Sequence, residues 1–174
     1  MKFTISREAL LKPLQTVSGV VEKRQTLPVL SNILVETTED RLTLTGTDLE
    51  VELLAQVEIE GAAPGEITLP ARKFMDICRT LPEGAQLQVS VEDGKALLRS
   101  GRSRFTLATL PATEFPSAEN IAASFELDIA QPDLKKLVDQ TQFCMANQDV
   151  RYYLNGLLLE IEHGKLRTVA TDGH

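Results

Sequence analysis

The chain has 174 residues, 43% hydrophobic and 25% charged, which is enough for a packed core in one domain or one and a fraction. Its net charge of −7 disfavours binding to nucleic acid. However, acidic residues dominate positions 36–60 and basic residues dominate positions 95–104, so the protein can still have a local basic surface. The alternative is that the charges are scattered and solvated. The polar Ser6-Arg7-Glu8 and the short apolar runs exclude a secretory signal and a membrane span, and predict a soluble cytoplasmic protein.

The first predicted element after an N-terminal strand is a helix that begins after Ser6, a suitable N-cap. An apolar stripe follows at spacings of four, three and four residues, and faces a core: Leu10, Leu14, Val17 and Val21. Pro13 lies inside the helix and removes one backbone hydrogen bond, so we expect a kink or a late start. The opposite face is neutral to basic: Lys12, Gln15, Thr16, Gly19 and Lys23.

Strands are predicted next over residues 33–37 and 41–45, around a Thr-Glu-Asp turn, and over 49–58, where the alternation is imperfect. A second helix is expected over residues 71–80, between Pro70 and Pro82. Its inward residues are Phe74, Ile77, Cys78 and Leu81.

Two more strands, 87–91 and 95–100, flank an Asp-Gly hairpin signal, and a strand over 104–109 follows. Residues 111–123 have the composition of a linker. A third helix is predicted over residues 132–142, opened by Pro132, with Leu134, Leu137 and Val138 inward.

A shift of 124 residues aligns residues 30–50 with residues 154–174 without a gap. Six of these 21 positions are identical: Leu30/Leu154, Leu34/Leu158, Glu36/Glu160, Leu42/Leu166, Thr47/Thr171 and Asp48/Asp172. The same shift aligns the first and third helices, so the order of elements repeats as well. We therefore predict a first domain over residues 1–124 and the N-terminal part of a second, truncated domain over residues 125–174. An incomplete domain leaves strand edges unpaired, which suggests a fragment of a longer protein.

No catalytic motif is present: the chain lacks G-x-S-x-G, the phosphate-binding G-x-x-x-x-G-K and G-x-G-x-x-G. Asp172 and His174 resemble an acid–base pair, but Asp172 is the repeat partner of Asp48, which favours a structural role. Cys78 and Cys144 have apolar neighbours and are expected to be buried thiols rather than a disulfide. Neither histidine is spaced as a ligand with a cysteine, so no metal site is predicted.

The repeat also places Arg24 opposite Gln148, two side chains that can donate to phosphate oxygens. Arg151-Tyr152-Tyr153 follows Gln148, and a cation beside two amphipathic rings suits contact with a nucleic-acid backbone. The alternative is that both tyrosines are half-buried with solvated hydroxyls.

Long motifs across the chain resemble the bacterial sliding clamp family, the β subunit of DNA polymerase III. They include Leu44-Thr45-Gly46-Thr47-Asp48-Leu49-Glu50, Ser100-Gly101-Arg102-Ser103-Arg104-Phe105 and Ala170-Thr171-Asp172-Gly173-His174. The resemblance implies an α+β DNA-clamp fold of repeated domains, each with two helices on one face of antiparallel sheets. It also implies a homodimeric ring around duplex DNA that tethers the replicative polymerase, without catalysis, cofactor or sequence-specific binding.

The resemblance assigns roles to particular residues. The positions that match DNA-contacting residues are Arg24, Arg72, Gln148, Tyr152 and Tyr153. Those that match the dimer interface are Lys73, Arg102, Arg104, Phe105 and Leu107. Part of a pocket for short motifs of polymerases, the clamp loader and repair factors is matched by Leu154, Thr171, Gly173 and His174.

Two other classes of function stay open at this point. One is an enzyme that uses Asp172 and His174 with residues missing downstream. The other is a β-rich module that binds a small apolar ligand in an internal pocket.

Overall fold

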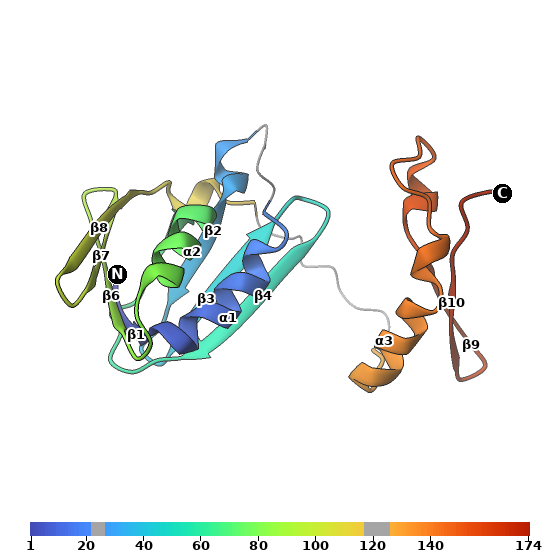
Figure 1. Cartoon of the computed structure of the whole chain (residues 1–174), viewed down its shortest axis with the longest axis horizontal. Helices are drawn as coiled ribbons and strands as arrows, with labels where there is room; N and C mark the ends of the chain where they lie inside the picture. Colours follow the sequence, from blue (N-terminus) through green and yellow to red (C-terminus); the bar gives the residue numbers. More distant parts are fainter. Residues whose placement is uncertain (22–26, 117–125) are drawn as a thin grey trace. The chain divides into compact units, whose positions relative to one another are not determined.

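The computed structural model describes residues 1–21, 27–116 and 126–174, and the chain forms two compact units, Met1–Asn120 and Ile121–His174 (Figure 1). Arg24, a predicted DNA contact, lies outside the described residues. The boundary predicted at residues 124–125 also lies outside them and stays a prediction.

The first unit contains two four-stranded antiparallel sheets and two helices. One sheet has the order β4-β3-β2-β5, from β2 (Asn32–Thr37), β3 (Arg41–Thr47), β4 (Glu52–Glu58) and β5 (Gly65–Pro70). The other has the order β1-β6-β7-β8, from β1 (Lys2–Ser6), β6 (Gln86–Glu92), β7 (Lys95–Ser100) and β8 (Ser103–Ala108). Helices α1 (Arg7–Ser18) and α2 (Ala71–Thr80) lie side by side on one face of the first sheet (Figure 1). The predicted fold class, α+β with two helices on one face of antiparallel sheets, is confirmed.

Helix α1 begins where the sequence predicts, because the Ser6 hydroxyl accepts the backbone N–H of Ala9 at 3.2 Å. The predicted late start is wrong: the helix continues through Pro13, with the apolar stripe Leu10, Leu14 and Val17 fully buried. Burial of each such side chain contributes about 1.5–3 kcal/mol, which offsets the single hydrogen bond that Pro13 removes. The helix ends at Ser18, so Val21 packs on the core from beyond its end.

Helix α2 has the predicted bounds and buries Phe74 and Cys78 completely. Its start needs no separate loop, since Pro70 ends β5 and Ala71 begins the helix. Arg7 donates from Nε to the carbonyl of Cys78 at 3.2 Å, where a cation beside a helix C-terminus is favourable. Glu8 accepts the N–H of Gly84 at 3.0 Å, and this hydrogen bond lowers the pKa of its carboxyl. The first contact joins the start of α1 to the end of α2, and the second joins it to the turn that follows α2.

The contact between α1 and β3 requires a glycine at position 46. A Cβ on Gly46 would lie 2.3 Å from the carbonyl oxygen of Val17, well inside van der Waals contact. This close approach places the end of α1 directly on the sheet.

The structure of the first unit differs from the prediction at the start of β4, at β5 and in the predicted linker. Strand β4 begins at Glu52 rather than at residue 49, because residues 48–51 form a turn in which the Asp48 carboxylate accepts the N–H groups of Glu50 and Val51 at 2.9 and 2.7 Å. Strand β5 is not among the predicted strands, although Ile67 and Leu69 alternate with polar residues in it. Much of the predicted linker is ordered: a 3₁₀ helix η2 (Ala112–Glu114) precedes Phe115, which is buried against Val29 and Leu30 of the 3₁₀ helix η1 (Pro28–Ser31).

The second unit repeats the first half of the first unit. Its elements are α3 (Gln131–Asp139), the 3₁₀ helices η3 (Gln142–Cys144) and η4 (Tyr152–Asn155), and the antiparallel strands β9 (Leu158–Glu162) and β10 (Lys165–Val169). The starts of α3, η4 and β10 lie 124 residues after those of α1, η1 and β3. The third helix is therefore confirmed, but it ends at Asp139 instead of near residue 142.

Apolar side chains of the second unit are more exposed than their repeat partners. Val35 and Leu42 are fully buried in the first unit, whereas their repeat partners Leu159 and Leu166 are 54% exposed and only partly buried, respectively. In the first unit β4, β5 and α2 complete the core, and residues 126–174 contain no equivalent of these elements.

Candidate nucleic-acid interface

The exposed face of α2 carries three cations. Arg72, Asp76 and Arg79 follow at spacings of four and three residues and therefore share one face, with Lys73 beside them. All four side chains are exposed, and within the described part of the chain none of the three cations belongs to an ion pair.

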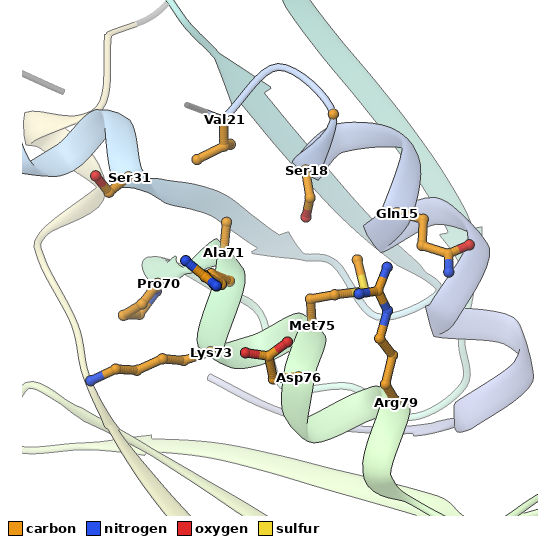
Figure 2. A pocket seen from close by; sticks show the side chains of 12 residues that line it. Gln15, Ser18, Val21, Ser31, Pro70, Ala71, Lys73, Met75, Asp76 and Arg79 are labelled. Atoms are coloured by element: carbon orange, nitrogen blue, oxygen red, sulfur yellow. The ribbon is translucent and has the colours of Figure 1, made fainter. Parts of the chain in front are cut away.

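This face borders a hollow of about 790 Å³ between α2 and the end of α1 (Figure 2). Arg72, Lys73 and Arg79 line it from α2, and Gln15 and Ser18 line it from α1. Figure 2 shows Arg79 extending toward the α1 side of the hollow, whereas Lys73 points away from α1. Guanidinium groups and an amide around an open hollow can donate to phosphate oxygens without reading a base sequence.

Gln15 and Arg79, two side chains of this hollow with long donor groups, are not among the predicted DNA contacts. The sequence contains a signal for both, because Gln15 belongs to the neutral-to-basic face of the first helix and Arg79 continues the helical spacing of Arg72. The family resemblance identified Arg72 alone as a DNA contact on this helix, whereas the helical spacing predicts that Arg79 lies on the same face.

In the second unit, residues 146–155 form a loop that is held by its own side chains. Arg151 forms a bidentate ion pair with Asp149, with Nε–Oδ1 and Nη2–Oδ2 distances of 3.0 and 2.8 Å. These side-chain hydrogen bonds, together with the backbone N–H of Arg151, lower the pKa of Asp149 to about 2, so the pair is ionised at neutral pH. The Asn155 amide exchanges two hydrogen bonds of 3.0 Å with the backbone of Asp149.

The loop presents Gln148, Tyr152 and Tyr153 at the surface. Gln148 has a left-handed backbone with φ of 58°, next to Asp149, which Arg151 and Asn155 hold by hydrogen bonds. Tyr152 and Tyr153 are 82% and 68% exposed and form an edge-to-face pair with ring centroids 6.0 Å apart. The half-buried alternative for the tyrosines is therefore wrong, and both rings are free to meet a ligand. The charge of Arg151, in contrast, is already paired with Asp149.

Residues 171–174, part of the predicted partner-motif pocket, form a turn that occurs twice in the chain. The Thr171 hydroxyl accepts the N–H of Gly173, and the Asp172 carboxylate accepts the N–H of His174, both at 3.0 Å. In the first unit Thr47 and Asp48 accept the equivalent N–H groups, of Leu49 and Glu50, at 3.0 and 2.9 Å. Asp172 therefore has the structural role that the repeat favoured. Leu154 of the same predicted pocket is half-buried in η4.

Four of the five predicted interface residues lie on β8 or directly before it, and β8 is an edge strand of its sheet, whereas Lys73 lies on α2. Arg102, Arg104 and Lys73 are exposed, and Phe105 is half-buried against the core. Leu107 is only 6% exposed and belongs to the core of the first unit, so little of its surface can meet a partner.

Neither cysteine forms a disulfide. Cys78 is buried as predicted, and burial raises the pKa of its thiol to about 12, whereas Cys144 is only half-buried. Within residues 1–21, 27–116 and 126–174, no cluster of three His, Cys, Asp or Glu side chains could hold a metal ion. No helix in the same ranges is long and apolar enough to cross a membrane.

The fold and these surfaces define a class, a protein of repeated α+β domains with polar and cationic helices on one face of antiparallel sheets. Comparison with known proteins identifies the family. Residues 1–119 match the DNA polymerase III beta subunit, N-terminal domain, and residues 128–174 match the central domain of the same subunit. The chain belongs to the DNA polymerase III beta subunit family.

Close relatives agree over the whole chain. The beta sliding clamp of Pseudomonas aeruginosa is 62% identical and that of Escherichia coli K12 is 55% identical, each aligned with 100% of this chain and 48% of its own length. A crystal structure of the P. aeruginosa subunit superimposes with a TM-score of 0.97 at 60% identity, covering 100% of this chain and 48% of that one. Another, of the P. aeruginosa clamp bound to griselimycin, gives 0.96 at 61% identity, with 100% and 47% covered. The chain thus spans about half the length of the relatives that it matches.

Proposed function

We propose that the complete protein to which this chain corresponds is a sliding clamp, which encircles duplex DNA as a homodimeric ring and tethers the replicative polymerase in the cytoplasm. The observation that carries the proposal is the family match across both units. The cationic face of α2 and the exposed loop 146–155 support it, because both offer donors suited to a phosphate backbone.

The mechanism is topological and needs no catalytic group. A closed ring cannot leave DNA sideways, so its direct contacts can be few, weak and independent of sequence. Arg72 and Arg79 offer charge at one hollow, while Gln148, Tyr152 and Tyr153 offer an amide and two rings. A lining with sparse cations suits sliding, since mobile counterions replace each phosphate contact easily. Processivity then follows from the high effective concentration of a tethered polymerase.

The partners follow from the same proposal. Besides DNA, we expect the replicative polymerase, the clamp loader and repair factors to bind through short motifs. Their site includes Leu154 and residues 171–174. The backbone contact that Asp172 shares with Asp48 favours this proposal over the enzymatic alternative.

The decisive experiment uses a version of the protein that spans the full length of its relatives. Changing Arg24→Ala together with Gln148→Ala should weaken binding to duplex DNA and loading onto circular DNA while the thermal unfolding curve stays the same. Fluorescence anisotropy at low and moderate salt measures the binding, and the salt slope should become shallower by roughly one for each phosphate that the variant no longer neutralises.

The matched control is Arg41→Ala with Gln86→Ala, which removes the same two kinds of side chain from exposed positions at the starts of β3 and β6. It should bind DNA normally. Wild-type affinity of the Arg24/Gln148 variant at low salt would exclude the assignment of these two residues.

A further inference from the structure

Arg151 contacts two segments that the chain separates by about 20 residues. Its guanidinium is held by Asp149 in the loop 146–155, and Nη2 also donates to the backbone carbonyl of Asp172 at 3.4 Å. The loop carries Gln148 and the tyrosine pair, and the turn 171–174 carries Thr171 and His174. One side chain therefore lies between the two surfaces of the second unit to which the proposed function assigns different ligands.

Gly173 leaves the space that this arrangement needs. A Cβ on Gly173 would lie 3.0 Å from Nη1 and 3.4 Å from Nη2 of Arg151, closer than ordinary contact. Its φ of 87° is also left-handed, a conformation that glycine adopts without strain. The position 124 residues earlier is Leu49, also left-handed with φ of 80°, and the repeat partner of Arg151 is Leu27. The glycine and the arginine thus occur together in the second unit, and neither occurs in the first.

We propose that Arg151 is a positioning residue that links the loop 146–155 to the turn 171–174, so that nucleic acid bound at the loop alters the turn and a peptide bound at the turn alters the loop. The link itself stands on the contacts above, while the identity of the two ligands rests on the proposed function. By thermodynamic linkage the two effects must be reciprocal, so either segment can report on the other.

The link is tested first without any ligand, by amide NMR of the 174-residue chain. Arg151→Ala should shift the amide resonances of Gly173 and His174 and lower their order parameters, because nothing then ties the turn to the loop. Arg151→Lys should do nearly the same, since an ammonium keeps the charge but cannot make a forked pair with Asp149 and reach Asp172 as well.

Arg167→Ala is the matched control for charge, because Arg167 also forms an exposed ion pair in the second unit, with Glu160, between β9 and β10. The turn should not respond to it. Unchanged Gly173 and His174 amides in Arg151→Ala would overturn the link.

The reciprocal test starts from the turn. Gly173→Ala should displace the guanidinium and shift the amides of residues 148–154 in the loop. Gly164→Ala is its control, because Gly164 is left-handed too, with φ of 72°, but has no atom within 4 Å of an added Cβ. Equal loop shifts in the two variants would mean that backbone strain alone is responsible, and the link would be rejected.

Coupling to a ligand is tested by titrating a version of the protein that spans the full length of its relatives with a short DNA duplex. In the wild type, Gly173 should shift with the same apparent Kd as Gln148, whereas in Arg151→Lys Gln148 should shift and Gly173 should not. A wild-type Gly173 that stays silent while Gln148 responds would refute the coupling. If the duplex shifts no residue, the assignment of the loop to DNA fails instead, and the ligand-free variants still decide whether Arg151 links the segments.

Discussion

At the scale of single residues, the repeat shows that one left-handed backbone conformation belongs to a turn that occurs in both units. Leu49 and Gly173 occupy the same left-handed position of the same turn, with φ of 80° and 87°. The turn is held in both copies by a threonine hydroxyl and an aspartate carboxylate that accept backbone N–H groups. An L-residue at this position costs about 1–2 kcal/mol, and these hydrogen bonds maintain it in the first unit.

Replacing Leu49 by glycine should therefore stabilise the protein. The Leu49 side chain is 60% exposed, so its removal sacrifices little burial. The control is Leu49→Ala, which removes the same side chain but keeps Cβ and therefore the left-handed strain. Glycine relieves that strain but costs conformational entropy on folding, so the free energy of unfolding of Leu49→Gly should exceed that of Leu49→Ala by about 0.5–1 kcal/mol. Urea unfolding measures the difference. A glycine variant less stable than the alanine variant would show that the left-handed leucine is not strained.

At the scale of elements, one buried hydroxyl joins β5 to the segment after β8. Thr68 is fully buried, and its hydroxyl accepts the side-chain N–H of Asn32 at 2.8 Å and donates to the carbonyl of Leu110 at 3.0 Å. Its backbone N–H donates to the same carbonyl at 3.1 Å. This cluster connects the strand β2, the edge strand β5 and the chain that leaves the second sheet.

Thr68→Val removes the hydroxyl with little change of shape and leaves the buried Asn32 amide without its acceptor. We expect the free energy of unfolding to fall by about 1–3 kcal/mol. Thr43→Val on β3 is the control, since Thr43 is half-buried and has no side-chain hydrogen bond among the described residues. Equal effects of the two substitutions in denaturant unfolding would contradict a specific role of the buried cluster.

At the scale of the whole molecule, β8 offers an open sheet edge with exposed cations beside it. In the described residues β8 pairs only with β7, so one row of its backbone groups lacks a strand partner. Arg102 and Arg104 are exposed there, and Phe105 is half-buried. This combination fits the proposed dimer interface, with Phe105 as its apolar contact.

We predict that Arg102→Glu and Phe105→Ala each weaken the dimer, tested in a protein that spans the full length of its relatives. Arg102→Glu removes a complementary charge and Phe105→Ala removes a packed ring, so the dimer Kd should rise by at least about tenfold in either variant. Sedimentation velocity measures the dimer fraction. Arg41→Glu, an equal charge reversal on β3, should leave it unchanged. An equally tight dimer in both the Arg102 and the Phe105 variant would exclude this edge. Leu107 is a poor probe, because its substitution would disturb the core first.

The sequence by itself determined the elements whose pattern is local. The Ser6 cap, the stripe Leu10-Leu14-Val17 and the Asp-Gly hairpin predict features that depend on neighbours along the chain. The 124-residue repeat is visible as well, because it compares two segments of the sequence directly. The sequence also identified the family, because the matching motifs are long. The end of α1 and the strand β5 could not be predicted correctly, since they depend on contacts with residues distant in sequence, Gly46 for the helix and β2 for the strand. The start of β4 was predicted too early for a local reason, because the turn at Asp48 interrupts the apolar alternation.

The tertiary structure alone decided which residues of each surface act together. It placed Gln15 and Arg79 on one hollow, left Tyr152 and Tyr153 exposed, and buried Leu107. It also paired Arg151 with Asp149 and brought it to Gly173, so a cation that resembled a DNA contact became a link between two surfaces. The physical reason is that burial, ion pairing and close approach are properties of pairs of residues in space, and a sequence records only their order.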